Sequence, residues 1–313
     1  MTAPEPRRLR VLLWHVHGSW TDAFVRGRHQ CLLPVSPAGA PWGLGLAGRD
    51  WPSASEVPLD AVAVAEPDVV VVQRPEELGV AERLGVPIVY VEHNAPRPYA
   101  ASSEHPLAGR SDITVVHVTH FNDAMWDCGN APTKVIPHGI PDPGTRYTGE
   151  LEAGVSMINE PVRRARVTGA DLLDVLAEVA PVDVFGMGTD ELTGRVRGLG
   201  DVTAPALHDE IARRRVFLHT ARWTSLGLSL LEAMHLAMPV VVFASTEAVA
   251  AVPPEAGVLS TDVSVLADGF RELLHEPDYA ALAGQNARAY ALKHFGLDAF
   301  LGAWDELLTE TTR

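Results

Sequence analysis

The chain has 313 residues, of which 47% are hydrophobic and 21% charged, a composition typical of an ordinary globular protein. This length exceeds what one hydrophobic core usually covers, so we expect two domains. The formal net charge of −15 at pH 7 is spread along the chain. It argues against nucleic acid as a partner, because neutralising phosphates requires a basic surface.

The two cysteines, Cys31 and Cys128, are too few for a disulfide framework and lack metal-ligand spacing. We therefore expect two reduced thiols in a cytoplasmic protein. The N-terminal segment MTAPEPRRLRVLLWHV has no signal-peptide core, and no stretch has the uninterrupted apolar length needed to cross a bilayer. The sequence therefore predicts a cytoplasmic protein with no transmembrane segment.

In the first half of the chain, short β-branched runs alternate with helix-length amphipathic segments. The periodicity predicts, in chain order, strands at 10–16, 30–35 and 68–73, a helix at 75–85, strands at 86–93 and 112–118, a helix at 119–129 and a strand at 133–137. Thr119 is the expected N-cap of the second helix. The segment PHGIPDPGTRYTGE (137–150) is rich in Pro and Gly without periodicity, which predicts a linker.

The alternation restarts after this linker. It predicts a strand at 153–159, a helix at 169–180, a strand at 181–188, a helix at 204–215, a strand at 216–220, a helix at 228–238, a strand at 239–243, and helices near 262–275, 278–294 and 297–310. Strand–helix–strand alternation means parallel sheets with helices on both faces. The fold class predicted is α/β, with two doubly wound Rossmann-like domains facing a cleft, and ligands at the carboxyl ends of the strands.

The stretch TSLGLSLLEAMHLAMPVVVF (224–243) contains a single charged residue, Glu232, in a helix that is apolar almost all round. A buried carboxylate requires a partner. The helix start at 225–227 offers glycine and free N–H groups, which favour an anion. A phosphate at the helix start and sugar hydroxyls on Glu232 would fit a nucleotide sugar. Alternatively, Glu232 lies at a solvated edge or pairs with an arginine of 213–215.

This stretch resembles the signature of the retaining GT-B glycosyltransferases of the group-1, or GT4-type, family, which reads Glu, seven residues, Glu, with a Gly-rich loop between and a Pro-Val strand after. The resemblance extends to VIPHGI (135–140), to VRRARVTGADLLDVL (162–176) and to the final helices. It implies an acceptor-side domain at 1–145, to which a helix at 297–313 returns, and a nucleotide-sugar donor domain at 146–296.

The resemblance also implies roles for single residues. Glu232 matches the glutamate that holds the donor ribose, and Ser225, Leu226, Gly227 and Leu228 match the loop that holds the diphosphate. Arg163 matches a phosphate-binding arginine. His93 matches a histidine near the donor sugar, and Gly18 a glycine in the N-terminal loop at the reaction centre.

Two positions depart from the family pattern. Thr224 stands where the family has its first glutamate, which contacts the transferred sugar, so His93 and Thr224 are the expected catalytic residues. Thr168 stands where the family has a lysine, and Arg166 or Arg164 is expected to replace its charge. Independently of the resemblance, Gly186 in FGMG (185–188) ends a predicted strand, where it could approach a nucleotide or form a tight turn.

Other motifs favour plainer interpretations. GLGLAG (43–48) has the glycine spacing of a dinucleotide site, but no strand leads into it, so it predicts a flexible loop. The pairs His15/His17 and His117/His120 have no acidic or Cys partner close in sequence, so we expect no metal site. The run Arg213–Arg215 is typical of a solvated helix end.

The expected function is transfer of a sugar from a nucleotide-diphosphate sugar to an acceptor hydroxyl with retention, without metal and without any cofactor beyond the nucleotide sugar. We expect a small soluble acceptor, with Trp42, Trp51 and Tyr99 available to stack on it. Two alternatives stay open: a nucleotide-sugar epimerase of the same architecture, and a non-catalytic nucleotide-sugar binding protein. The sequence does not indicate an oligomeric state.

Overall fold

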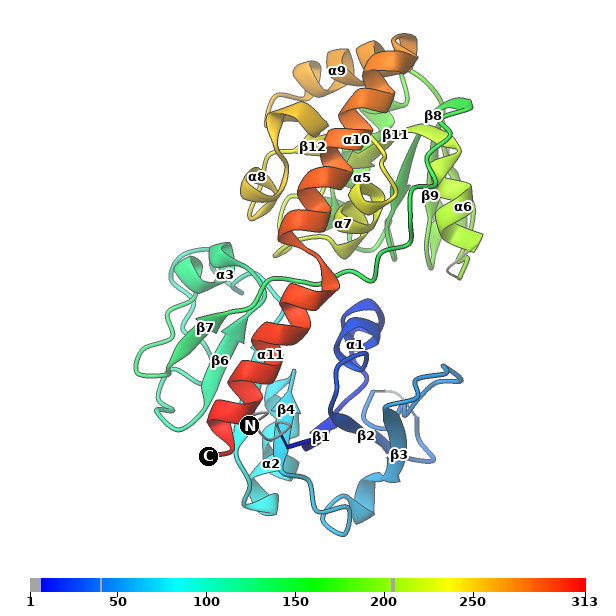
Figure 1. The fold of residues 1–313 in the computed structure, drawn as a ribbon. Helices are drawn as coiled ribbons and strands as arrows, with labels where there is room; N and C mark the ends of the chain where they lie inside the picture. Colours follow the sequence, from blue (N-terminus) through cyan, green and yellow to red (C-terminus); the bar gives the residue numbers. More distant parts are fainter. Residues whose placement is uncertain (1–6, 40, 204–205) are drawn as a thin grey trace, which may run out of the picture. The chain divides into compact units, whose positions relative to one another are not determined.

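The computed structural model describes residues 7–39, 41–203 and 206–313. The chain divides into two compact units (Figure 1): unit 1 comprises Met1–Gly139 with Leu297–Arg313, and unit 2 comprises Ile140–Gly296. Each unit contains one parallel sheet with helices packed on it. The prediction of two doubly wound α/β domains is confirmed.

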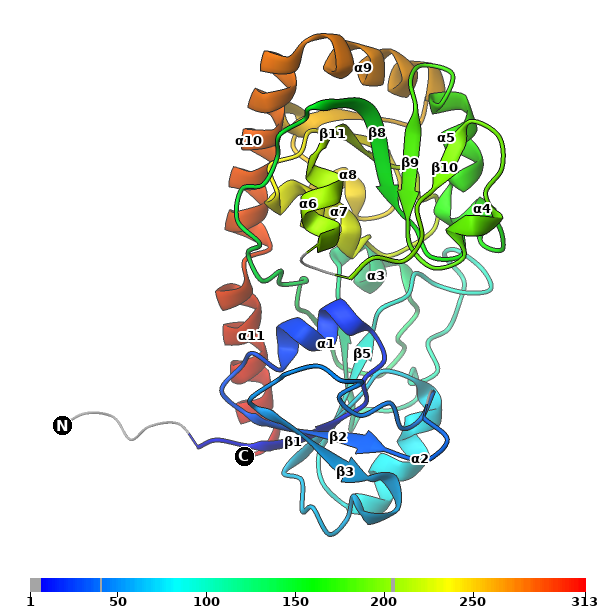
Figure 2. The same cartoon turned by 90° about the vertical axis from the view of Figure 1, so that its right-hand side faces the viewer.

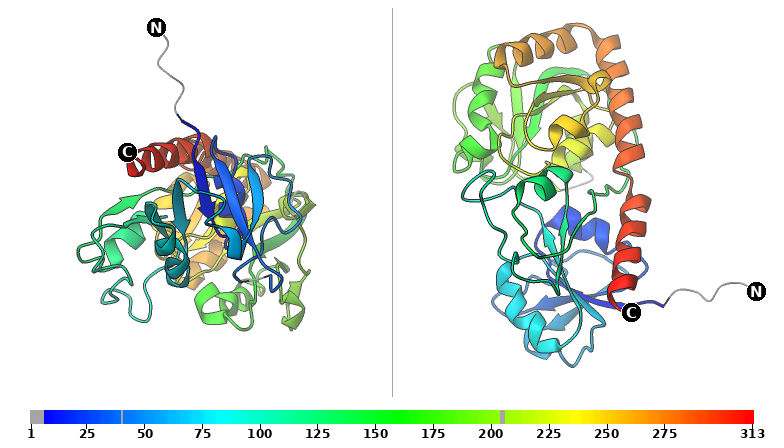
Figure 3. Two further views of the ribbon diagram at one scale, coloured as in Figure 1. Left: turned by 90° about the horizontal axis from the view of Figure 1, so that it is seen from below. Right: turned by 90° about the vertical axis from the view of Figure 1, so that its left-hand side faces the viewer.

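Unit 1 contains a seven-stranded sheet with the order β3-β2-β1-β4-β5-β6-β7, and all its ladders are parallel. Its first strands are drawn in blue in the left view of Figure 3. The strands are β1 (Arg10–Leu13), β2 (Gln30–Val35), β3 (Ala54–Pro58), β4 (Val69–Val72), β5 (Ile88–Glu92), β6 (Thr114–His117) and β7 (Thr133–Val135). Every residue of β4 is buried, as expected for a valine run in a parallel sheet.

The helices of unit 1 cover both faces of this sheet, because right-handed crossovers that run in opposite directions from the sheet centre lie on opposite faces. They are α1 (Gly18–Phe24), η1 (Leu59–Ala61), η2 (Pro75–Glu77), α2 (Leu78–Ala81), η3 (Glu82–Leu84), α3 (His120–Met125) and α11 (Leu297–Thr311). Helices α1 and α11 are joined by edge-to-face contacts of Trp304 with Trp20 and Phe24, at 5.7 and 5.2 Å between ring centroids. The Thr119 side chain accepts a hydrogen bond from the Asn122 amide, which confirms it as the N-cap of α3.

Unit 2 contains a six-stranded parallel sheet with the order β10-β9-β8-β11-β12-β13. Strands β8, β9 and β10 lie side by side in Figure 2. The strands are β8 (Leu151–Met157), β9 (Val182–Phe185), β10 (Val196–Gly198), β11 (Arg214–His219), β12 (Val240–Phe243) and β13 (Gly257–Ser260). Successive residues of β11 point to opposite faces: Phe217 joins one apolar cluster, whereas Val216 and Leu218 join the other.

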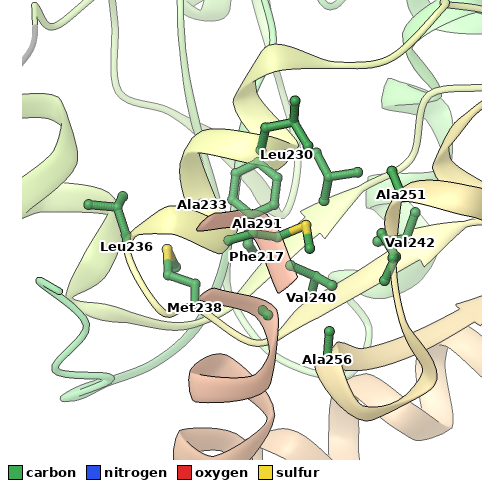
Figure 4. Close-up of a cluster of buried hydrophobic side chains, with 14 of the residues drawn as sticks. Phe217, Leu230, Ala233, Leu236, Met238, Val240, Val242, Ala251, Ala256 and Ala291 are labelled. Carbon is green, nitrogen blue, oxygen red and sulfur yellow. The ribbon is translucent and has the colours of Figure 1, made fainter. Parts of the chain in front are cut away.

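The helices of unit 2 divide between the two clusters. They are α4 (Ala165–Thr168), α5 (Ala170–Leu176), η4 (Thr189–Glu191), α6 (Ala206–Ala212), α7 (Leu228–His235), α8 (Ala248–Ala251), η5 (Pro254–Ala256), α9 (Val263–His275) and α10 (Pro277–His294). Helix α7 packs on α10 and on β11 and β12. In Figure 4 Phe217, Leu230, Met238 and Ala291 meet in the cluster beneath α7. This core fixes α7 against the sheet, and with it the loop that precedes α7.

Several elements differ from the sequence prediction. Strands β3, β10 and β13 and helix α8 were not predicted, because each has only three to five residues, too few to show a hydrophobic period. Residues 18–24 form α1 rather than a loop. The helix predicted at 75–85 is instead a series of short turns, η2, α2 and η3. Residues 204–205 of the helix predicted at 204–215 lie outside the described residues.

The segment after β7 has no helix or strand before β8, as predicted for a linker. Ile140 forms an isolated bridge with Gly296, and its amide donates to the Phe295 carbonyl at 2.9 Å. The two points at which the chain passes between unit 1 and unit 2 are therefore hydrogen-bonded to each other.

Candidate functional site

Each sheet has one point at which the strand order reverses, between β1 and β4 in unit 1 and between β8 and β11 in unit 2. Loops that leave the carboxyl ends of such strands diverge and leave room for a ligand. The residues that follow these strands therefore define the candidate site of each unit. The predicted donor residues at 163–168, 186 and 224–232 all lie in unit 2, whereas His93 and Gly18 lie in unit 1.

In unit 2, the structure brings two of the predicted donor segments together. The Val167 carbonyl accepts hydrogen bonds from the amides of Arg222 and Trp223, at 2.9 and 3.3 Å. The Thr220 hydroxyl donates to the Thr168 carbonyl at 3.1 Å. Segment 163–168 thus lies against the loop that runs from β11 to α7. Thr168 uses its own hydroxyl to bond the Arg164 carbonyl at 3.1 Å, so it contributes to holding the end of α4.

The loop before α7 presents backbone rather than side chains. Ser225 and Leu226 are buried, at 2% and 6% exposure, and Leu226 belongs to the apolar core. Gly227 is the N-cap of α7, and it has no side chain with which to cap the helix. The first amides of a helix have no intrahelical acceptor. The start of α7, at Gly227 and Leu228, therefore offers N–H groups and a positive dipole end to an anion.

The structure shows why residue 227 is a glycine, which the sequence alone did not indicate. A Cβ at this position would come within 2.5 Å of Cε1 of His219, the last residue of β11. The His219 ring is buried, and this burial lowers its pKa to about 4, so the ring is neutral at pH 7. The glycine makes room for this imidazole directly beneath the helix start.

Glu232 finds its partner on a neighbouring helix. Its Oε2 lies 3.6 Å from Nε2 of His208 on α6, and the Glu232 side chain is 17% exposed. The alternative pairing with an arginine of 213–215 is wrong, because each of those arginines pairs with a different carboxylate. These pairs are Arg213 with Glu150, Arg214 with Asp183, and Arg215 with Glu152.

The prediction of a solvated helix end at 213–215 is also wrong for one residue. Arg214 belongs to β11 and is 7% exposed, and its guanidinium binds the buried Asp183 carboxylate through Nε and Nη2, each at 2.9 Å. Both nitrogens reach the same oxygen, Oδ2, in a charge-assisted interaction. Asp183 also forms an ion pair with Arg197 at 2.7 Å. Because Asp183, Arg197 and Arg214 belong to β9, β10 and β11 respectively, their ion pairs link these three strands.

The arginines near the helix start differ in their partners. Arg163 pairs with Glu160, and Arg166 with Asp171 at 2.9 Å. Arg222, which sequence analysis missed, also binds Asp171, with its Nη2 at 3.0 Å from Oδ2. Within the described residues, the half-buried Arg164 side chain forms no ion pair. Its charge helps to lower the pKa of Glu160, but it would not have to break an ion pair to bind an anion.

Gly186 follows β9 and has φ +133°, a conformation that side chains rarely adopt. A Cβ there would also overlap the Ile158 carbonyl oxygen. Gly186 therefore allows a backbone conformation that other residues rarely adopt, in a tight turn at the carboxyl edge of the sheet. Thr224 is half-buried in the loop before α7. Its contact with a sugar stays a prediction.

In unit 1, four histidine and aromatic side chains gather at the carboxyl ends of the strands. His93 follows β5, and its ring centroid lies 4.2 Å from that of His17 and 5.3 Å from that of Trp20. His138, which follows β7, lies 6.4 Å from His93. Gly18 is the first residue of α1, with the Arg49 guanidinium 3.2 Å from where its Cβ would be.

These histidines are neutral at pH 7. Burial holds the pKa of His93 well below its ordinary value, and the neighbouring His17 and His138 lower it further. Burial likewise lowers the pKa of His138 to about 3. Nδ1 of His138 has no hydrogen-bond partner within the described residues. The position of His138 in VIPHGI did not indicate a role in this cluster, because only the fold brings it to His93.

The three aromatic residues proposed for the acceptor differ in exposure. Trp51 is 6% exposed and donates through Nε1 to Asp22 at 2.8 Å, so it is a packed structural residue. Trp42 is 38% exposed with the Arg74 guanidinium 4.3 Å above its ring. Tyr99 is 66% exposed. Segment 43–48 forms turns and one isolated bridge, as predicted for a loop.

In the part of the chain that the structure describes, no group of three or more His, Cys, Asp or Glu side chains is arranged to hold a metal ion. Cys31 and Cys128 are free and buried. Burial raises the pKa of Cys31 to about 12 and that of Cys128 to about 11, so both stay thiols at pH 7. None of the helices in residues 7–39, 41–203 and 206–313 is long and apolar enough to cross a bilayer.

Residues 189–290 match the sequence model of the family described as glycosyl transferases group 1. This segment lies in unit 2 and includes the loop before α7 and Glu232. No curated protein matches the sequence.

Several solved structures are similar to this chain, among them two that match nearly its whole length. Sucrose-phosphate synthase from Thermosynechococcus elongatus is 15% identical with a TM-score of 0.75, over 96% of this chain and 98% of that one. Anabaena HepE in complex with UDP-glucose is 18% identical with a TM-score of 0.76, over 97% of this chain and 100% of that one. TarM is 17% identical with a TM-score of 0.64, over 77% of this chain and 54% of that one. The fold is therefore that of the GT-B glycosyltransferases.

Proposed function

We propose that the protein is a glycosyltransferase that moves a sugar from a nucleotide-diphosphate sugar to an acceptor hydroxyl. The observation that carries the proposal is the match of 189–290 to the glycosyl transferases group 1 model, which covers the uncapped start of α7 and Glu232. Structures of HepE with UDP and with UDP-glucose show that a protein of this fold holds such a donor.

The start of α7 and the arginines beside it would hold the diphosphate. The amides of 225–228 point their dipoles at the anion, and Arg164 adds a positive charge. Arg163 and Arg166 join after leaving Glu160 and Asp171, which form exposed and therefore weak pairs. This positive potential replaces a metal ion in the proposal, and no cofactor is required.

Glu232 would bind the ribose hydroxyls of the nucleotide. Its carboxylate faces His208 at 3.6 Å, which is longer than a hydrogen bond, so its oxygens keep acceptor capacity for hydroxyl donors. In unit 2, Thr224 would contact the transferred sugar through its hydroxyl. In unit 1, His93 keeps the role near the donor sugar that the resemblance implies for it.

The proposed reaction retains the anomeric configuration. The bond from the anomeric carbon to the phosphate oxygen breaks, and a bond to the acceptor oxygen forms on the same face. The acceptor proton passes to the leaving phosphate oxygen. The arginines and the α7 amides stabilise the charge that develops on the diphosphate. The GT4-type assignment, a small soluble acceptor and a cytoplasmic location belong to the same proposal.

A non-catalytic nucleotide-sugar binding protein is the second candidate, because Thr224 and Thr168 replace two charged residues of the family pattern. A third, an epimerase, would interconvert nucleotide sugars without an acceptor. One experiment separates all three: incubation with UDP-, GDP-, dTDP- and ADP-hexoses, with and without a panel of small polyols and monosaccharides, followed by proton NMR. A transferase releases nucleoside diphosphate and forms a glycoside whose anomeric configuration matches the donor's. An epimerase forms a new nucleotide sugar without acceptor, and a binding protein forms neither product.

A further inference from the structure

A chain of hydrogen bonds links the carboxyl ends of β1, β4 and β5 in unit 1. Trp14 follows β1, Gln73 follows β4 and His93 follows β5. The Gln73 side chain is 4% exposed and lies between the other two residues. Its Nε2 donates to the Trp14 carbonyl oxygen at 2.7 Å, and its Oε1 lies 3.0 Å from Nε2 of His93.

The Trp14 carbonyl fixes the orientation of the Gln73 amide. If the amide were turned over, two oxygens would face each other across 2.7 Å, and neither carries a hydrogen. Gln73 therefore presents its oxygen to His93. A neutral imidazole has one N–H and one lone-pair nitrogen, so the nitrogen that faces an oxygen must carry the proton. His93 is thus protonated on Nε2 and has its lone pair on Nδ1.

The surroundings of His93 keep this arrangement. The ring packs at 4.2 Å from His17 and meets the Trp20 ring edge-on at 86°. Nδ1 of His93 makes no hydrogen bond within the described residues. Because burial and the flanking histidines keep the pKa of His93 low, the ring offers a lone pair at Nδ1 rather than a second N–H.

We propose that Gln73 is a positioning residue that holds His93 in the Nε2-protonated tautomer and thereby makes Nδ1 the acceptor for one hydroxyl of the transferred sugar. The tautomer follows from unit 1 alone, whereas the sugar contact rests on the proposed function. His93 then orients the sugar by accepting a hydrogen bond and supplies no proton to the reaction.

Nitrogen-15 NMR of histidine-labelled full-length protein tests the tautomer directly. The His93 resonances are those lost in His93→Gln, and at pH 7 we expect Nε2 protonated and Nδ1 bare. Gln73→Leu, which removes the oxygen that faces Nε2, should release the constraint and give a mixture of the two tautomers. A wild-type His93 protonated on Nδ1 or on both nitrogens overturns the proposal, as does an unchanged tautomer in Gln73→Leu.

Kinetics with the nucleotide sugar that the protein turns over provide the second readout. Gln73→Leu should lower kcat/KM by about tenfold, the size expected for one lost hydrogen bond. Its affinity for the nucleoside diphosphate, which the proposal places in unit 2, should be unchanged. If no nucleotide sugar is turned over while the tautomer is as stated, the proposed function fails and the positioning role of Gln73 stands. If a nucleotide sugar is turned over but His93 is in the other tautomer, the proposed function stands and the positioning role of Gln73 fails.

Discussion

Substituting Gly227 by alanine tests how the loop before α7 is built. The backbone at this position has φ −72° and ψ 117°, which alanine adopts without strain, so the effect must come from the added methyl group. That group would stand 2.5 Å from Cε1 and 3.3 Å from both nitrogens of His219. The imidazole would have to move by roughly an ångström within a packed core.

Overpacking of this kind costs about 1–3 kcal/mol. For a chain of this size, we expect Gly227→Ala to lower the midpoint of thermal unfolding by about 5 °C. We also expect weaker nucleotide binding, because the amides of 225–228 shift with the ring. Urea unfolding monitored by circular dichroism gives the free energy, and calorimetric titration with nucleoside diphosphate gives the affinity.

His219→Ala supplies the decisive comparison. In that background the added methyl group meets no ring, so Gly227→Ala should cost at most about 0.5 kcal/mol, the scatter expected of non-interacting sites. Gly302→Ala is the matched control, because a Cβ there meets nothing within 4 Å. An equal cost of Gly227→Ala with and without the His219 ring would refute the steric explanation.

Three further predictions concern the ion pairs and histidines. Arg214→Met leaves the buried Asp183 with Arg197 as its remaining arginine partner, so urea unfolding should show a loss of about 1.5–3 kcal/mol, the size expected for hydrogen bonds to a charged group; a loss below 1 kcal/mol would contradict the account. His138 has its pKa lowered from 6.5 to about 3, so the unfolded state binds more protons and the unfolding free energy should fall by about 1.4 kcal/mol per pH unit as pH drops from 6.5. Because other buried histidines such as His93 and His219 contribute slopes of the same sign, His138→Asn should reduce the slope in urea titrations by about 1.4 kcal/mol per pH unit, and an unchanged slope would disprove the assignment. Arg164→Ala should weaken nucleoside diphosphate binding about tenfold, and more than Arg163→Ala, because Glu160 already neutralises Arg163; the opposite order in calorimetry would exclude Arg164 as the phosphate ligand.

The fold class is predictable because strands buried on both faces consist of continuous apolar runs, such as VVVV at 69–72. Strand β3 escapes prediction for the opposite reason. Its residues ASEVP lie at the sheet edge, and none of them is buried. Helix α1 begins with glycine, and the side chain of its N-cap residue, His17, makes no capping hydrogen bond. Its local sequence therefore favours a loop.

The candidate site is predictable where its residues are contiguous. Residues 224–232 lie in one segment, and the resemblance names them together. His208 and Gln73 escape prediction because each reaches its partner from a different element, across 24 and 20 positions in the sequence respectively. No local pattern indicates such a contact, since only the order of strands in the sheet brings the elements together. The same holds for Arg222, which reaches Asp171 from 51 positions away.

Calorimetric titration of the full-length protein with UDP, GDP, dTDP, ADP and CDP tests the central claim, a nucleotide-sugar site at the start of α7, most directly. We predict that at least one nucleoside diphosphate binds, and that Glu232→Ala weakens it about tenfold, the loss expected for hydrogen bonds to a charged group. The control Glu272→Ala, on the exposed side of α9, should bind as the wild type does. Absence of binding to all five nucleotides, or binding that Glu232→Ala leaves unchanged, would contradict the account.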